Sequence, residues 1–418
     1  MPLIDMKDML MHAYENGYAV GAFDLAEMDF LPAVLAAAES ARAPVILNMI
    51  EPWFESPAFA WVMAAVEAAA ARATVPVAIC FDRDTDALSV MRGVRLGANG
   101  AVASALQESL FRHIDRTRAI VQAAHACGVP VEGELAYAPD GDVAEGAGPC
   151  TVQSPTVAEA KGFVERTKVD FLAVSVGMAR GRGKSRFDWG RLKEINAALR
   201  IPLAIRDEMV PGGEQCHRLI MLGIAKIHCS AALNDMASEQ LRANVRRDRN
   251  ADYSVLKEGV REVIATQLEP RMRAWGSAGR AAEVLSRCGP WNNIMHVVVF
   301  NVPRLETQAL RTLMAEGQRV LSGVPGVRAV QVGSVADEGG RYRHCILARL
   351  VSAAAAEAFR RDPTYVGFME RHLAPVASDR VAGDYRVADH IPGIPALAAL
   401  ASAPHLAPVE GRGFEQLT

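Results

Sequence analysis

The chain has 418 residues, half of them hydrophobic, which is enough for one large and one small domain with full cores. Lys and Arg (45) nearly balance Asp and Glu (48), and the net charge of −3 argues against a general nucleic-acid-binding protein. Seven dispersed cysteines without CxxC spacing favour a reducing compartment. The charged N-terminus does not fit a signal peptide, and the apolar stretch at 61–71 is too short for a membrane span. We therefore expect a cytoplasmic protein that binds neither nucleic acid nor membrane.

Eight short apolar runs alternate with helical stretches between about residues 18 and 230. The runs read YAVGAF, PVILNM, PVAICF, NGAVAS, VPVEGEL, VDFLAVSV, IPLAI and IAKIHC. Strands that alternate with helices indicate a parallel sheet covered on both faces. Eight is also the number of strands that closes a (β/α)8 barrel. The sequence therefore predicts an α/β fold of the TIM-barrel type for this part of the chain.

The pattern changes after Cys288-Gly289-Pro290. Residues 253–274 read as one long closing helix with a proline interruption, which ends the barrel. Beyond the boundary we expect a small ferredoxin-like α+β domain, with strands at 294–301, 327–333, 343–350 and 381–387 and helices at 304–322, 352–361 and 364–373. The predicted domains are a barrel at 1–288, an α+β domain at 293–388 and a C-terminal tail at 389–418.

Charged residues gather just past the apolar runs, where barrels of this type carry their active sites. Three of them are arginines that each close a run, namely Arg83, Arg180 and Arg206. A guanidinium group is always protonated and has no lone pair for a metal. We predict a site without metal or cofactor that binds a small anion. The candidate catalytic residues are Asp82, Glu134, Arg83, Arg180 and Arg206, and the candidate substrate contacts are Asp24, Arg182, Lys184, Asp207 and His228.

Neighbouring arginines repel each other by roughly 4 kcal/mol at about 4 Å in a partly polar site, so negative charge must compensate them. One source is the protein's own carboxylates, which would close an internal ion network. The other is an anionic substrate held by bidentate hydrogen bonds. In the same way, Asp82 is either a general acid and base or an ion-pair partner of the arginines, and Lys226 is either a Schiff-base amine or a structural lysine. These alternatives stay open at this point.

Residues 1–285 resemble the class II, zinc-dependent fructose- and tagatose-bisphosphate aldolases. The resemblance is carried by GYAVGAFDLAEMDFLPAVLAAAESARAPVIL, PVAICFD, VPVEGEL, VDFLAVSVGMARG and WGSAGRA. It implies a barrel with aldolase-like lyase activity. It also implies that Arg83, Arg180 and Arg206 stand where this family has zinc-binding histidines. Asp82 matches the family's acid/base aspartate, and Glu134 matches its strand-five glutamate.

Residues 294–387 look like the stress-responsive α/β-barrel (Dabb) family. The resemblance is carried by Met295-His296-Val297-Val298-Val299-Phe300, Gly323-Val324-Pro325-Gly326-Val327, Gly333 and Asp362-Pro363-Thr364-Tyr365. It implies pairing of sheets between two copies, so we expect a homodimer. His296 matches the family's first-strand histidine, and Tyr365 stands where a second histidine is common. They are the candidate ligand site of this domain, although His296 is also explained as a hydrogen-bonded core residue.

Two functions follow from these residues. The first is a metal-independent, aldolase-like carbon–carbon lyase, or related enolate chemistry, on a small phosphorylated or carboxylated carbonyl compound. The alternative is a catalytically inactive aldolase-like scaffold whose second domain dimerises, or binds or cyclises a small ligand. The identity of the negative charge opposite the arginines separates the two.

Overall fold

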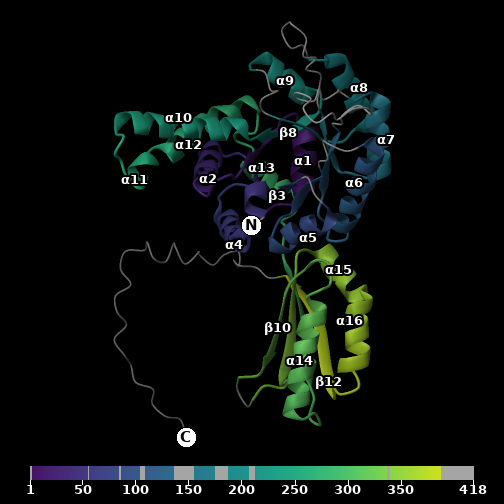
Figure 1. The fold of residues 1–418 in the computed structure, drawn as a ribbon. Helices are drawn as coiled ribbons and strands as arrows, with labels where there is room; N and C mark the ends of the chain where they lie inside the picture. The colour runs from purple at the N-terminus through teal and green to yellow at the C-terminus, as the bar shows by residue number, and fades with distance from the viewer. Residues whose placement is uncertain are drawn as a thin grey trace. The chain divides into compact units, whose positions relative to one another are not determined.

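The computed structural model describes residues 2–54, 56–83, 86–103, 109–135, 155–174, 187–206, 212–336 and 339–386. Eight parallel strands form a closed barrel in chain order, which confirms the fold class predicted from the sequence (Figure 1). The strands are β1 (Val20–Asp24), β2 (Val45–Met49), β3 (Val77–Arg83), β4 (Gly100–Ala103), β5 (Val131–Leu135), β6 (Phe171–Val174), β7 (Leu203–Arg206) and β8 (Ile224–Cys229). The barrel closes because β8 pairs with β1, with Ala22 opposite His228.

Most helices surround the barrel on its outside, whereas the first helix packs against the lumen-facing side chains (Figure 1). The helices are α1 (Met6–Glu15), α2 (Phe30–Ala41), α3 (Glu51–Phe54), α4 (Phe59–Arg72), α5 (Ala87–Leu96), α6 (Leu110–His125), α7 (Val157–Thr167), α8 (Trp189–Leu199), α9 (Glu214–Met221), α10 (Ala231–Arg247), α11 (Tyr253–Leu256), α12 (Val260–Ala274) and α13 (Ala281–Arg287). Within the described ranges, no helix is long and apolar enough to cross a bilayer.

The prediction of one long helix at 253–274 is wrong. The structure divides it into α11 and α12, and Gly259 at the junction has φ +77°. Only glycine adopts this left-handed backbone without strain, so the chain turns there. Pro270, where the interruption was predicted, lies inside α12 instead.

Two cores flank the barrel strands because side chains of a strand alternate between its faces. One set, which includes Phe23, Leu47 and Ile79, packs against the outer helices. The other set points into the lumen and includes Val20, Ala22, Ile46, Ala78 and Cys80. Continuing the inward set toward the carboxyl ends of β1, β2 and β3 gives Asp24, Asn48 and Asp82. The lumen therefore changes from apolar to polar at the end where barrel enzymes hold their substrates.

Residues 294–386 form a four-stranded antiparallel sheet in the order β10-β11-β9-β12. Its elements are β9 (Ile294–Asn301), α14 (Thr307–Leu321), β10 (Val327–Ser334), β11 (His344–Leu350), α15 (Ala353–Arg361), α16 (Pro363–Phe368), the π-helix η2 (Met369–Leu373) and β12 (Asp379–Arg386). Along β9, Ile294, His296, Val298 and Phe300 are buried, whereas the alternate residues are partly exposed. Helices α14 and α15 contact the sheet, so the buried side chains lie beneath them. This arrangement is the α+β fold predicted from the sequence.

Candidate active site

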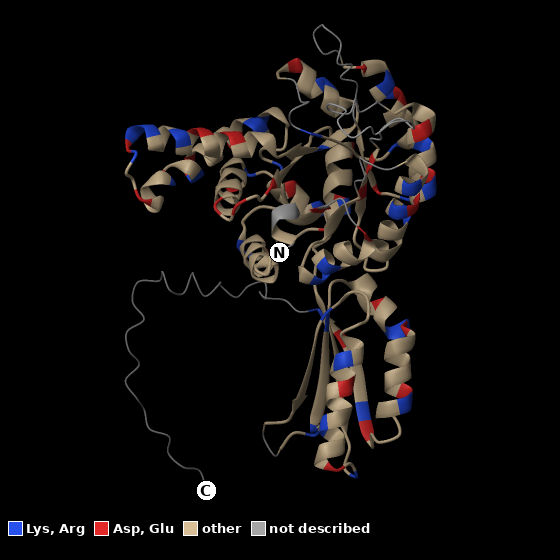
Figure 2. Ribbon diagram, viewed as in Figure 1, with Lys and Arg blue, Asp and Glu red and all other residues tan. Residues whose placement is uncertain are grey.

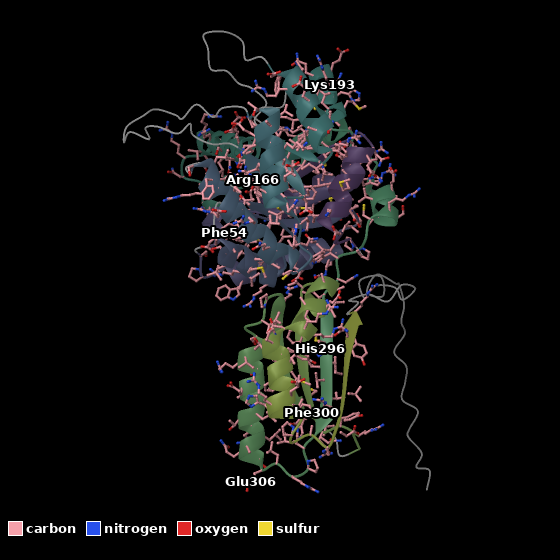
Figure 3. All side chains as sticks on the ribbon, turned by 90° about the vertical axis from the view of Figure 1, so that its right-hand side faces the viewer. Phe54, Arg166, Lys193, His296, Phe300 and Glu306 are labelled. Carbon is pink, nitrogen blue, oxygen red and sulfur yellow. The ribbon has the colours of Figure 1, made fainter. Side chains whose placement is uncertain are left out.

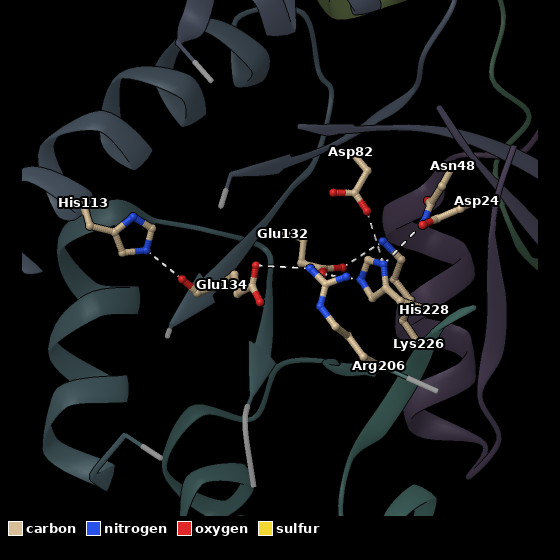
Figure 4. A network of polar contacts seen from close by, with 9 residues as sticks. All are labelled: Asp24, Asn48, Asp82, His113, Glu132, Glu134, Arg206, Lys226 and His228. Carbon is tan, nitrogen blue, oxygen red and sulfur yellow. Dashed lines mark hydrogen bonds and ion pairs between the residues drawn. The ribbon is translucent and has the colours of Figure 1, made fainter. Parts of the chain in front are cut away.

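A buried group of ionised side chains links β5 and β8 across the lumen (Figure 4). Lys226 Nζ lies 2.8 Å from Glu132 Oε2, and His228 Nε2 lies 2.6 Å from Glu132 Oε1. Both contacts have hydrogen-bond length, and all three side chains are at most 4% exposed. Lys226 and His228 are two residues apart on β8, so strand alternation directs both to the lumen. Glu132 therefore bridges two cations.

A second set of contacts surrounds the other nitrogen of His228. Asp82 Oδ2 lies 3.5 Å from Nδ1, and Asn48 Nδ2 lies 3.3 Å from it. Asn48 also donates to Asp24 Oδ1 at 3.0 Å. These side chains come from the ends of β1, β2 and β3, which pair in register. His228 is thus the point at which β1, β2, β3 and β5 meet.

Arg206 is the more open part of the site. Its Nη2 lies 3.5 Å from Glu134 Oε2, and its side chain is 39% exposed, against 11% for Glu134. The backbone of Glu134 is fixed separately, because His113 Nε2 donates to its carbonyl oxygen at 2.7 Å. The single 3.5 Å contact between Arg206 and Glu134 is longer than the contacts of a bidentate arginine–carboxylate pair. Arg206 also keeps access to solvent.

Burial and neighbouring charges set the protonation of this group. Burial alone would lower the pKa of His228, but the carboxylates of Glu132 and Asp82 outweigh it and raise this pKa to about 9. Burial alone would also lower the pKa of Lys226, yet its neighbouring acidic groups raise it above its ordinary value. At neutral pH both side chains are therefore cations. A protonated amine cannot attack a carbonyl, so the Schiff-base interpretation of Lys226 has no support.

The pKa values of the carboxyl groups are shifted in opposite directions. Burial would raise the pKa of Asp82, but the hydrogen bond and charge of His228, with Lys226 and Arg206, lower it overall. The pKa of Glu132 is lowered in the same way by His228 and Lys226 against its burial. Burial and the charge of Asp82 raise the pKa of Asp24. Asp82 is therefore an ionised acceptor at neutral pH, and Asp24 is the carboxyl group most ready to hold a proton.

The structure brings together five of the ten barrel residues predicted as site residues. They are Asp24, Asp82, Glu134, Arg206 and His228. Arg83 ends β3, but its side chain lies outside the described part. Arg180, Arg182, Lys184 and Asp207 also lie outside the described residues.

Sequence reasoning assigned no site role to Glu132 or Asn48, and it left Lys226 open between a Schiff-base amine and a structural lysine. The two-residue spacing along the strands did indicate Glu132 and Lys226. Glu132 stands two residues before Glu134, and Lys226 stands two residues before His228, so each pair shares one face of its strand.

Comparison with known proteins places this arrangement in a family. Residues 4–280 match the family model described as "Fructose-bisphosphate aldolase class-II", and residues 294–387 match "Stress responsive A/B Barrel Domain". The chain belongs to the class II fructose-bisphosphate aldolase family. Its second part belongs to the stress-responsive A/B barrel domain family.

Named relatives match about two thirds of the chain. The fructose-bisphosphate aldolase of Thermus caldophilus is 32% identical over 311 residues, which cover 67% of this chain and 100% of that protein. The sulfofructosephosphate aldolase of Alkalicoccus urumqiensis is 26% identical over 289 residues, which cover 67% of this chain and 99% of that protein. The crystal structure of the YdjI aldolase from Escherichia coli K12 superposes with a TM-score of 0.56 at 23% identity, over 67% of this chain and 99% of that one. This last likeness shows the fold.

The zinc that the class II resemblance implies does not fit the described residues. Among them, no group of three or more His, Cys, Asp and Glu side chains is placed to hold a metal ion. The carboxylates present face cations, since Glu132 contacts Lys226 and His228, and Glu134 faces Arg206. Arg206 itself offers no lone pair. We therefore derive no chemical step through a metal.

Proposed function

We propose that the barrel is an aldolase-type lyase that works without a metal on a small anionic carbonyl compound. The observation that supports this most is the set of side-chain cations in the lumen, with Arg206 and His228 near the carboxyl ends of β7 and β8 and Lys226 deeper on β8. Fixed positive charge can stabilise the enolate that forms when a carbon–carbon bond next to a carbonyl breaks. Two of the named relatives are a fructose-bisphosphate aldolase and a sulfofructosephosphate aldolase, and a phosphorylated or carboxylated substrate is the class that such a site would attract.

In this proposal the residues have three roles: anion binding, proton transfer and contacts to the rest of the substrate. Arg206, with Arg83 and Arg180, binds the anionic group and stabilises the enolate oxygen. Asp82 and Glu134 accept and return protons, and Asp82 suits the first step because it is ionised. Proposed contacts to the rest of the substrate are Asp24, Arg182, Lys184, Asp207 and His228.

Asp82 is a weak base because its pKa is lowered, so the cations must supply much of the driving force. As a carbonyl oxygen gains negative charge, nearby guanidinium and imidazolium groups stabilise it more than they stabilise the neutral ketone. Only such differential stabilisation accelerates the reaction. The second candidate function, an inactive scaffold, rests on the fact that Glu132 and Glu134 already face the described cations.

Metal removal and proton exchange test the lyase proposal. The protein is treated with a chelator, its metal content is measured, and the exchange of the carbon-bound protons of dihydroxyacetone phosphate in D2O is followed by proton NMR. We expect exchange to persist in the metal-free protein and to fall by about 100-fold or more in Asp82→Asn, because a positioned base contributes at least this much. Asp115→Asn, at an exposed ion pair on α6, is the matched control.

Two results would count against the lyase proposal. Exchange that disappears with the chelator and returns with zinc would show a metal enzyme. No exchange with dihydroxyacetone phosphate or with a set of phosphorylated and carboxylated ketones would favour the scaffold.

We also propose that the second domain forms a homodimer through the open face of its sheet. Val381 and Tyr385 on β12 are 50% and 57% exposed, and Val297 on β9 is partly exposed on the same face. Burial of such a face stabilises association by roughly 25 cal/mol for each Å² of apolar surface. We expect light scattering after size-exclusion chromatography to give twice the chain mass, and Val381→Lys to shift it to one. Phe111→Lys, at an exposed aromatic residue on α6, should leave the mass unchanged. A monomeric wild-type protein would refute the proposal.

A further inference from the structure

An irregularity in an edge strand of the second domain redirects one arginine. β10 pairs with β11, but the register shifts between Val327 and Ala329, so Arg328 is the extra residue of a β-bulge. A bulge of this kind can aim a side chain away from the regular alternation of the strand. The side chain of Arg328 reaches hydrogen-bond partners that precede the second domain in the chain.

The strongest of these contacts is a bidentate ion pair with Glu67 on α4. Nη1 and Nη2 of Arg328 lie 2.5 and 2.7 Å from Oε1 and Oε2 of Glu67, between residues 261 positions apart. The two side chains are 12% and 24% exposed. Burial would raise the pKa of Glu67, but the hydrogen bonds and charge of Arg328 lower it overall, so the pair is ionised at neutral pH. The pair joins the second domain to the barrel, and residues 1–386 form one compact unit.

The same guanidinium group reaches the carboxyl end of α5. Its Nε donates to the carbonyl oxygen of Arg95 at 3.0 Å, and its Nη2 donates to that of Leu96 at 3.3 Å. The last carbonyl groups of a helix have no partner within it, and a cation is favourable there. In return, Arg95 Nη2 donates to the carbonyl oxygens of Gly323 and Val324, just after α14, at 3.1 Å each. Each domain thus donates an arginine to the other at the end of a helix.

The sheet that carries Arg328 is a firm support. β10 is joined through β11 to β9, where His296 (Figure 3) is 3% exposed. The Nδ1 of His296 lies 2.6 Å from Asp384 Oδ1 on β12, and its Nε2 lies 2.8 Å from the Tyr365 hydroxyl oxygen on α16. These buried contacts tie two strands and a helix together. We therefore expect the sheet to hold Arg328 in a fixed position.

Helix α5 packs directly on the strand that carries Asp82. A Cβ atom at Gly93 would lie 2.2 Å from the Phe81 ring, so only glycine lets α5 approach β3 this closely. The Phe81 ring also packs on Phe54 (Figure 3), with ring centroids 4.2 Å apart. Phe81 and Asp82 are consecutive on β3, so alternation places the ring toward the helices and the carboxylate in the lumen. Asp86, whose side chain accepts two backbone hydrogen bonds, fixes the start of α5.

We propose that Arg328 is a positioning residue for the barrel, which acts through α5 to hold β3 and the carboxylate of Asp82 in place. The second domain is then a structural part of the proposed lyase rather than an independent module. The effect on rate rests on the lyase activity proposed above, whereas the effect on α5 and β3 does not.

Amide hydrogen exchange of the full-length protein, followed by mass spectrometry, tests the effect on α5. Arg328→Met keeps much of the side-chain volume but removes every donor. We expect peptides from α5 and β3 to exchange about tenfold or more faster, because charged hydrogen bonds stabilise by at least this factor, and peptides from α8 to exchange as in the wild type. Arg319→Met, at an exposed arginine on α14, should leave all of these peptides unchanged.

Rates separate a positioning role from a merely structural one. With dihydroxyacetone phosphate, Arg328→Met should lower kcat of proton exchange by about 10- to 100-fold at an unchanged KM, since a displaced base changes the rate and not the binding. Glu67→Gln should lower stability but keep kcat within about twofold of the wild type, because Arg328 keeps its bonds to α5. Arg328→Lys, which keeps the charge, should recover part of the rate and takes the place of Arg328→Met if that variant fails to fold.

Two results would overturn the proposal. One is unchanged exchange of the α5 and β3 peptides in Arg328→Met. The other is faster exchange of these peptides with an unchanged kcat, because Arg328 would then only join the two domains. If the wild type exchanges no proton of the ketone, the lyase proposal fails, and the peptides alone decide whether Arg328 holds β3 in place.

Discussion

Replacing Glu132 with glutamine is expected to lower the free energy of unfolding of the barrel by about 3–5 kcal/mol, the usual cost of removing one partner of a buried ion pair. Glu132 is fully buried and bonds to both Lys226 and His228. Glutamine keeps the volume but removes the charge, so two cations lose their shared counter-ion in a medium that solvates them poorly. Urea unfolding followed by circular dichroism measures the loss.

Matched variants show whether charge causes this loss. Glu165→Gln removes an exposed carboxylate on α7 that pairs with Lys161 and should cost about 0.5 kcal/mol or less. Combining Glu132→Gln with Lys226→Met should cost less than the sum of the single changes, because the second removes a cation that the first leaves unpaired. Additive losses would show that Glu132 matters for packing rather than for its charge.

The same group predicts how stability changes with pH. The pKa of His228 is raised in the folded chain to about 9, above its unfolded value of about 6.5. Its contribution is therefore complete below about pH 6.5 and is lost as the pH rises through about 9. Glu132 and Asp82, with lowered pKa values, and Lys226, with a raised one, keep their charges across this window. His228→Asn should flatten the decline in stability over this pH range.

The strand pattern was predictable because it is local. Each apolar run became a barrel strand, and the described residues at the run ends lie together in the lumen, since period-two alternation follows from short stretches of sequence. The Lys226–Glu132 pair was not predictable in the same way. Its members are 94 residues apart and meet across the lumen, and alternation predicts which face a side chain occupies but not its partner.

Charged side chains gather in the lumen of the barrel as well as on its outer helices. Figure 2 shows acidic and basic segments interspersed along the outer helices of the barrel, including α10. Inside the lumen, by contrast, Arg206, Lys226 and His228 lie among four carboxyl groups (Figure 4). The sequence left open whether the cations are balanced by the protein's own carboxylates or by an anionic substrate. The first alternative describes the deep part of the lumen, and the second suits its open end. Glu132 forms a closed network at depth, and Arg206 lies at the open end.

Replacing Arg206 with alanine is expected to lower kcat/KM of the proposed lyase by about 100- to 1,000-fold, as removal of one charge-stabilising donor does in other enzymes. Its side chain is 39% exposed and its Nη2 faces Glu134 at 3.5 Å, so an entering anion can reach it. Arg206→Lys should recover part of the activity, because lysine keeps the charge but loses the planar, bidentate geometry. Arg166→Ala, at an exposed arginine on α7, should behave as the wild type.

Binding of inorganic phosphate distinguishes an open arginine from a closed ion pair. If Glu134 competes with the anion for Arg206, Glu134→Gln should bind phosphate more tightly than the wild type, and Arg206→Ala should bind it at least about tenfold more weakly, since one charged contact is worth roughly 1.5–3 kcal/mol. Calorimetric titration measures both. If Arg206 served only to neutralise Glu134, Arg206→Ala would reduce stability and leave the affinity for phosphate equal to that of the wild type. The opposite responses of two neighbouring residues to one ligand would therefore assign the positive charge of Arg206 to the substrate.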